Sequence, residues 1–201
     1  PKINIFLNAI NQNLNNNGVG IVEVPNFDMI LKKKLYSEFI IDHLFYFTKK
    51  TLIKTLRING FQVLKIDSIW DDYILSAKIK KISGKKTTNL KNNFKKTKKI
   101  KLKDLRNHFK LIRKKINELT SNYRKNDIAV WGAGHQSLTL ISQTKLINKI
   151  KYIIDSAKFK QNKFAPGINL KIVSPTQFIK DSLKVIIVLG GGYSREICEM
   201  V

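Results

Sequence analysis

Asp42 and His43 interrupt the segment FIIDHLFYF (residues 39–47), whose other residues are all apolar or aromatic. Imidazole titrates near neutral pH, so a histidine can take up or release a proton under physiological conditions. A neighbouring carboxylate favours the cationic imidazole, and apolar surroundings restrict access of water. The pair is therefore a candidate for general acid–base chemistry. The alternative is a core or interface histidine whose hydrogen bonds are satisfied and which does no chemistry.

A second candidate is the segment GAGHQS (residues 132–137), which comes between an expected strand and an expected helix. Backbone N–H groups and a helix N-terminus at such a turn can face an anion. Gly132 and Gly134 would shape this turn, and His135 and Gln136 would be phosphate or ribose contacts. The alternative is that the two glycines only permit a tight turn and that His135 only begins the helix.

Asp155 ends the expected strand IKYIID, 23 residues after Gly132, close to the spacing of an acid that binds a ribose hydroxyl. Taken alone this spacing suggests NAD. However, Ser137 replaces the third glycine of the dinucleotide fingerprint, and the unit is too short for a fold of two nucleotide-binding halves. Lys160 follows as a cation suited to a nucleotide diphosphate, with ordinary solvation of a loop lysine as the alternative.

The elements that position Asp42 and His43 follow from periodicity and punctuation. The first part of the chain predicts helix, strand, long loop, helix, strand, strand. The corresponding segments are residues 3–14, 18–27, 28–47, 48–60, 61–70 and 73–82. Thr48 is the expected N-cap of the second helix, and Asn59-Gly60 ends it. We expect the last two strands to be antiparallel and the three-stranded sheet to have an open edge that needs a partner.

The second part of the chain begins with one apolar seam on a long helix, spaced 4, 3, 4, 3 and 4 residues apart. Its members are Leu105, Phe109, Ile112, Ile116, Leu119 and Tyr123. The seam either docks onto its own domain or pairs with another copy in a homo-oligomer. Strands then alternate with helices to the end of the chain, which predicts a parallel sheet with Rossmann-like winding.

Charge and composition exclude several classes of protein. The formal net charge is +24, but only five of the 38 basic residues are Arg, and no nucleic-acid motif accompanies them. We therefore expect small anionic ligands rather than nucleic acid. Apolar runs are too short to span a bilayer, and a single cysteine excludes an internal disulfide and a multi-cysteine zinc site. We expect no membrane partner, no metal and a cytoplasmic location.

Five segments, in this order, resemble the S-adenosylmethionine-dependent sugar C-methyltransferases. They are GVGIVEVPNFD, EFIIDHLFYFTKKTL, NGFQVL, WGAGHQSLTL and IDSAKFKQNKFAPGINLKIVSP, and the resemblance runs from about Gly18 to Ser194. It implies an α/β fold: the end of a class I methyltransferase sheet (residues 1–82), a Lys-rich connector (residues 83–103) and a Rossmann-like C-terminal domain (residues 104–201). The family's glycine-rich cofactor strand and its cysteine-rich zinc module are not in the chain. The resemblance thus implies that S-adenosylmethionine is bound mainly by another segment and that this chain alone does not methylate.

The resemblance also implies roles for residues. His43 matches the family's base, which removes a proton from the carbon beside a sugar ketone so that the enolate attacks the donor methyl group. Asp42 matches its acidic neighbour, where Glu is usual. Ile40 replaces a Tyr, and residues 70–72 (Trp-Asp-Asp) replace an HGG element. The implied substrate is a nucleotide-linked keto-deoxy sugar; a noncatalytic nucleotide-sugar-binding module and an O- or N-methyltransferase stay open as alternatives.

Overall fold

The computed structural model describes residues 2–82 and 102–201. Most of the expected connector, residues 83–103, therefore lies outside the described residues. The chain forms two compact units: unit 1 comprises Pro1–Leu35 and Ile41–Leu105, and unit 2 comprises Tyr36–Ile40 and Arg106–Val201. A short segment from the first third of the chain is thus part of unit 2.

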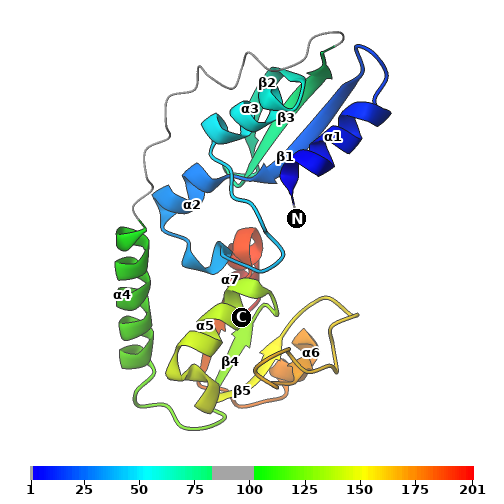
Figure 1. The fold of residues 1–201 in the computed structure, drawn as a ribbon. Helices are drawn as coiled ribbons and strands as arrows, with labels where there is room; N and C mark the ends of the chain where they lie inside the picture. The colour runs from blue at the N-terminus through cyan, green and yellow to red at the C-terminus, as the bar shows by residue number, and fades with distance from the viewer. Residues whose placement is uncertain (1, 83–101) are drawn as a thin grey trace. The chain divides into compact units, whose positions relative to one another are not determined.

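Unit 1 is a three-stranded antiparallel sheet with helices (Figure 1). Its elements are α1 (Ile3–Asn13), β1 (Val19–Pro25), α2 (Phe27–Lys33), α3 (Lys49–Ile58), β2 (Phe61–Ile69) and β3 (Ile74–Lys81). The strand order is β1-β3-β2, and β3 is antiparallel to both neighbours. The expected antiparallel pair is confirmed, and among the described residues β1 pairs only with β3.

The core of unit 1 lies between one face of this sheet and the helices α1 and α3. Alternate residues of β3 point into it, namely Leu75, Ala77 and Ile79, and α3 contributes Leu52 and Leu56. The expected start of α3 is confirmed, because the Thr48 side chain accepts a hydrogen bond from the Thr51 backbone N–H in a capping box.

Helix α2 is a correction to the sequence-based expectation of a long loop after β1. The Asn26 side chain accepts hydrogen bonds from the backbone N–H groups of Asp28 and Met29, and so caps the helix. Phe27, Met29 and Ile30 are buried. A helix of seven residues is too short to show a repeating apolar pattern, so its tertiary packing, rather than its periodicity, identifies it.

Unit 2 is a four-stranded parallel sheet with the order β6-β5-β4-β7, as the alternation of strands and helices predicts. Its elements are η1 (Tyr36–Glu38), α4 (Lys103–Leu119), β4 (Ile128–Trp131), α5 (His135–Gln143), η3 (Lys145–Asn148), β5 (Ile150–Ile154), β6 (Ile172–Val173), α6 (Pro175–Ile179), β7 (Val185–Val188), η4 (Gly191–Tyr193) and α7 (Ser194–Met200). Strand β6 falls in a segment expected to be loop, because two residues carry no detectable pattern.

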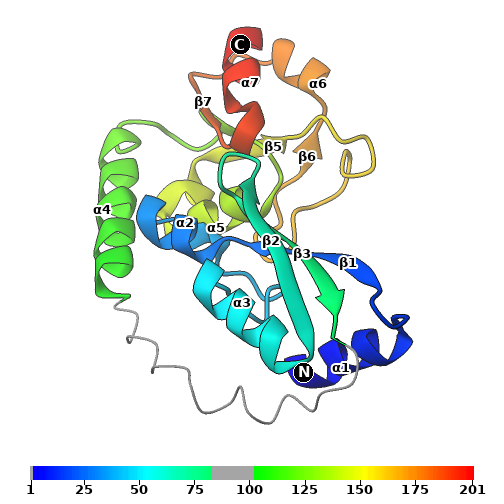
Figure 2. The ribbon, with the colours of Figure 1, turned by 90° about the horizontal axis from the view of Figure 1, so that it is seen from above.

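Helices cover both faces of this sheet (Figure 2). One core contains Val130, Ile141 and Ile153 and receives Ile116 from α4 and Tyr123 from the turn after it. The other core joins the opposite face of the strands to α6 and α7. The α4 seam therefore packs on its own unit through Ile116 and Tyr123, and also through Phe109, which stacks on Tyr36, whereas Leu119 stays 72% exposed. No helix in the described residues is both long and apolar enough to cross a membrane.

Candidate functional site

The turn between β4 and α5 lies at the carboxyl end of the parallel sheet, the edge where ligands bind in open α/β folds. Gly132 has φ +112°, and a Cβ there would lie 2.4 Å from the Leu189 carbonyl oxygen. Gly132 is thus required for close packing against the end of β7. Gly134 has φ −109°, and a Cβ there would meet no atom within 4 Å, so space is open at this position.

The first turn of α5 has polar groups without a side-chain hydrogen-bond partner among the described residues. Gly134 is its N-cap residue and supplies no side-chain cap, which leaves the first N–H groups of a nine-residue helix without that partner. Ser137 is 0% exposed, and its Oγ has no hydrogen-bond partner among the described residues. This Oγ lies 3.5 Å from the Cβ position at Gly132, beneath the turn. The turn can therefore donate hydrogen bonds to an anion.

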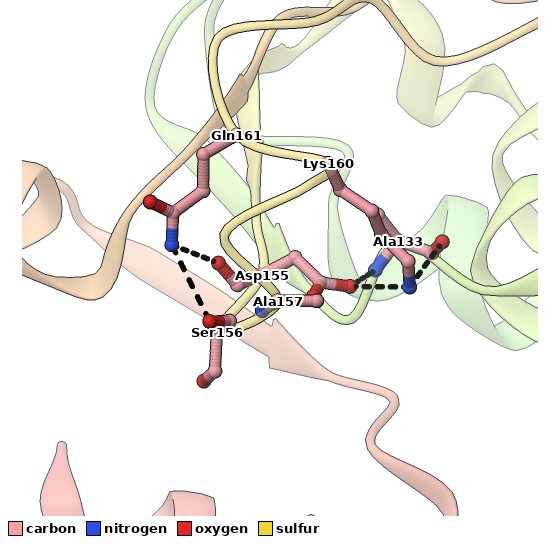
Figure 3. A network of polar contacts seen from close by, with 6 residues as sticks. All are labelled: Ala133, Asp155, Ser156, Ala157, Lys160 and Gln161. Atoms are coloured by element: carbon pink, nitrogen blue, oxygen red, sulfur yellow. Dashed lines mark hydrogen bonds and ion pairs between the residues drawn. The ribbon is translucent and has the colours of Figure 1, made fainter.

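Asp155 clips this turn to the end of β5 (Figure 3). Its Oδ2 accepts hydrogen bonds from the Ala133 N–H at 2.8 Å and from Lys160 Nζ at 3.0 Å. Its Oδ1 accepts one from the Ala157 N–H at 2.8 Å. Lys160 also donates to the Ala133 carbonyl oxygen at 3.3 Å. The Asp155 carboxylate and the Lys160 ammonium group thus form an ion pair, and both also hydrogen-bond to the backbone of Ala133 in the turn.

The Asp155 carboxyl group remains ionised because of these contacts. Burial raises its pKa, but the N–H groups of Ala157 and Ala133 and the ammonium of Lys160 outweigh burial and place the pKa below the ordinary value. Asp155 therefore acts here as a structural clip at the position where the sequence suggested a ribose contact. Gln161 adds to the clip by donating to the Asp155 carbonyl oxygen at 3.0 Å.

His135 and Gln136 are brought to the turn, but their side chains contact Glu38. Gln136 Nε2 donates to Glu38 Oε1 at 2.7 Å, and His135 Nε2 lies 3.2 Å from Glu38 Oε2. Glu38 is only 2% exposed. Sequence reasoning missed it, although an acid in the otherwise apolar or hydroxyl-bearing run YSEFII was a visible signal.

Asp42 and His43 belong to unit 1 and lie in an irregular loop between η1 and α3. Asp42 is exposed and His43 is half-buried, with its ring edge-on to Tyr46 at a centroid distance of 6.3 Å. In the described part of the chain, no hydrogen bond links the Asp42 and His43 side chains. The loop therefore offers an accessible imidazole whose orientation is set partly by an aromatic neighbour.

The turn that stands in place of the HGG element has a distinctive backbone. Trp70, Asp71 and Asp72 have φ values of 53°, 53° and 67°, three successive residues in the left-handed region. Asn26 Nδ2 donates to the Asp72 carbonyl oxygen at 2.8 Å, which ties this turn to the cap of α2. The Trp70 side chain is 76% exposed.

A separate hollow of about 660 Å³ in unit 2 is formed mainly by α4 and the η3 region. Its lining residues are mostly basic: Lys110, Arg113, Lys114, Asn117, Glu118, Ser121, Lys145 and Lys149. Lys149 Nζ is already bonded to the carbonyl oxygens of Thr120 and Ser121. None of the sequence-predicted site residues lines this hollow.

The fold and turn define a class of protein: an α/β chain with a glycine turn at the carboxyl edge of a parallel sheet. Residues 76–201 match the family described as C-methyltransferase C-terminal domain. This match spans more than half of the chain, which therefore belongs to that family. It confirms the resemblance to the C-terminal part of a C-methyltransferase. The family places the chain in a methyltransferase context. No curated protein matches it.

The strand ends of unit 1, in the residues that the structure describes, form no turn suited to S-adenosylmethionine. At the end of β1, where a parallel α/β domain would place a ligand-binding turn, the chain reads Pro25-Asn26, and the Asn26 side chain occupies the first N–H groups of α2. No glycine turn joins a strand to a helix in the described residues of unit 1. These residues do not fit the cofactor, and we assign none of them to it.

Proposed function

We propose that this chain is part of an S-adenosylmethionine-dependent methyltransferase that C-methylates a nucleotide-linked keto-deoxy sugar. The observation that carries the proposal is the family match of residues 76–201, joined to an open, uncapped glycine turn within that range. The cofactor is held mainly by residues other than those of this chain.

His43 is the general base in this proposal. Its imidazole takes the proton from the carbon next to the sugar ketone, which leaves an enolate as the carbon nucleophile. Asp42, adjacent in sequence, supports the imidazolium that forms. S-adenosylmethionine supplies the methyl group. The half-buried setting of His43 and its contact with Tyr46 support this role, because they limit hydration of the ring without closing it off.

The nucleotide diphosphate of the substrate binds at the glycine turn. The open space at Gly134 and the uncapped N–H groups of α5 support this placement. Gly132, Asp155 and Lys160 shape the turn and hold it in place. Lys160 also brings a positive charge to the turn, although the Asp155 carboxylate partly neutralises that charge.

Calorimetric titration of the chain with uridine or thymidine diphosphate, and separately with S-adenosylhomocysteine, tests the binding part. We expect the diphosphate to bind and S-adenosylhomocysteine not to. Gly134→Asp should abolish diphosphate binding without loss of stability, because Asp is a good N-cap that occupies the same N–H groups and repels phosphate. Gly134→Asn gives the cap without the charge and should weaken binding less. Tight diphosphate binding by the Gly134→Asp variant would refute this placement.

Exchange of substrate protons tests the base. The chain is incubated in D₂O with a nucleotide-linked keto sugar, and NMR follows deuterium incorporation next to the ketone. We expect incorporation that is lost in His43→Ala and retained in His108→Ala, which removes a different histidine. Binding of the sugar nucleotide without His43-dependent incorporation would favour a noncatalytic binding module or an O- or N-methyltransferase.

A further inference from the structure

Glu38 is a buried carboxylate in unit 2 that contacts the side chains of His135 and Gln136. Burial of a carboxylate is costly unless hydrogen bonds compensate for lost water. Glu38 receives such bonds from Gln136 at 2.7 Å and from His135 at 3.2 Å, which are the first two residues of α5. The His135 contact is a hydrogen bond to Glu38 in the imidazole tautomer that carries its proton on Nε2.

The segment that carries Glu38 is anchored at a second point. The ring of Tyr36 stacks on Phe109 of α4, with 4.3 Å between centroids and 19° between the ring planes. Between these anchors the segment forms only η1, a 3₁₀ helix of three residues. So short a helix has little stability of its own, so the contacts with Phe109, His135 and Gln136 contribute to the order of Tyr36–Ile40.

These contacts also determine what the glycine turn presents. Because both side chains bond to Glu38, neither His135 nor Gln136 fills the open space at Gly134. We propose that Glu38 is a positioning residue for the anion site at the glycine turn: it fixes the first turn of α5 in an open arrangement for a diphosphate. Binding of the diphosphate and docking of Tyr36–Ile40 then stabilise each other, since coupling between two sites is reciprocal.

This inference rests on the proposed nucleotide site. The direction in which diphosphate affinity changes when Glu38 is removed distinguishes two roles for this residue. A negative charge near a phosphate site opposes anion binding by Coulomb repulsion. If Glu38 acted only through its charge, its removal would tighten diphosphate binding. If Glu38 positions the turn, its removal weakens binding despite the favourable change in charge.

Titration of uridine diphosphate into Glu38→Ala, Glu38→Gln and the wild-type chain separates these cases. We expect Glu38→Ala to weaken binding about 5-fold or more. Glu38→Gln should retain most of the affinity, because an amide of the same shape still accepts from Gln136. Glu118→Gln is the control: it removes one charge from an exposed side chain of α4 that pairs only with Lys114 at 3.7 Å among the described residues. Unchanged or tighter binding in Glu38→Ala would overturn the proposal.

Hydrogen–deuterium exchange without ligand tests the same role independently of the nucleotide. Glu38→Ala should increase exchange in Tyr36–Ile40 and in the first turn of α5 while β5 stays protected. If Glu38→Ala does not fold, Gln136→Ala removes one partner of the carboxylate and should show the same pattern more weakly. Unchanged exchange at both places refutes the positioning role; failure of the wild-type chain to bind diphosphate refutes only the nucleotide site.

Discussion

At the scale of single residues, the two glycines of the turn have different physical reasons to be glycine. Gly132 combines a positive φ with a neighbouring backbone oxygen that leaves no room for a Cβ. Gly134 has neither constraint. The packing of the described residues therefore accounts for glycine at position 132, whereas it does not require glycine at position 134.

Gly132→Ala should therefore destabilise unit 2 by about 2–4 kcal/mol, the combined effect of a strained φ and of overpacking against a backbone atom. Gly134→Ala should cost less than about 1 kcal/mol, the usual effect of a poorer N-cap. Urea unfolding followed by tryptophan fluorescence measures both, since Trp131 directly precedes the turn. Equal costs for the two substitutions would contradict the packing argument.

The Asp155 clip predicts a pH dependence of stability. Its pKa is lower in the folded state than in the unfolded chain, where an Asp titrates near about 3.9. The stabilisation is therefore complete above about pH 5 and is lost as the pH falls through the unfolded-state value and then the folded-state pKa. Asp155→Asn should be less stable than the wild type at neutral pH, because the amide NH₂ group that replaces one carboxylate oxygen cannot accept a hydrogen bond from a backbone N–H. It should also lose less stability on acidification.

Unfolding of unit 2 between pH 7 and pH 3 checks this difference. Glu199→Gln, which removes a largely exposed carboxylate, corrects for the loss of one charge. Asp127 and Asp181 also have lowered pKa values. Asp127 accepts a hydrogen bond from the Arg124 N–H, and Asp181 pairs with Lys151 at 3.1 Å. Both the wild type and Asp155→Asn therefore retain some acid sensitivity. Parallel pH profiles for these two proteins would show that the clip contributes nothing.

At the scale of elements, the turn between β2 and β3 stores backbone strain. Three successive residues other than glycine in the left-handed region are unusual, and each costs free energy that glycine avoids. The hydrogen bond from Asn26 to Asp72 helps to hold this arrangement. The turn is thus linked to the N-cap of α2 by a hydrogen bond, and the Trp70 side chain within it is exposed.

Asp71→Gly should stabilise unit 1 by about 0.5–1 kcal/mol, since glycine adopts φ +53° without strain. Ser68→Gly, in the extended backbone of β2, is the matched substitution and should destabilise by a similar amount. Thermal unfolding followed by circular dichroism measures both shifts. A fall in stability for Asp71→Gly would mean that the Asp side chain matters more than the backbone strain.

At the scale of the whole molecule, the most pronounced property is the large positive net charge. A net charge of +24 on 201 residues produces self-repulsion in the folded chain, and salt screens it. The basic hollow beside α4 shows how densely the lysines gather in one region. Any polyanion will be attracted without reading a sequence, so weak, salt-sensitive binding of nucleic acid is expected from charge alone.

Thermal stability should therefore rise when NaCl is increased from about 20 to about 300 mM, a range over which the screening length falls severalfold. Differential scanning calorimetry measures this rise. Affinity for duplex DNA should fall steeply over the same range. Stability that falls with salt would mean that attractive ion pairs, such as Lys160 with Asp155, outweigh the general repulsion.

The sequence by itself determined the elements with a strong local signal. The antiparallel pair β2 and β3, the Thr48 cap of α3 and the parallel α/β order of unit 2 all follow from periodicity and capping over a few residues. It also located the glycine turn and its neighbour Asp155, because strand ends and loop lengths are local properties. The sequence did not predict the seven-residue α2 or the two-residue β6, since neither element is long enough to repeat a pattern.

Only the tertiary structure decided what the site residues contact. Glu38 and His135 are 97 positions apart in sequence, and no local pattern relates them. The spacing of Asp155 matched a ribose-binding acid, yet its carboxylate is used by the Ala133 N–H and Lys160. Hydrogen bonds and ion pairs of this kind depend on distances of about 3 Å between side chains. Such distances are set when the sheet and its helices pack together.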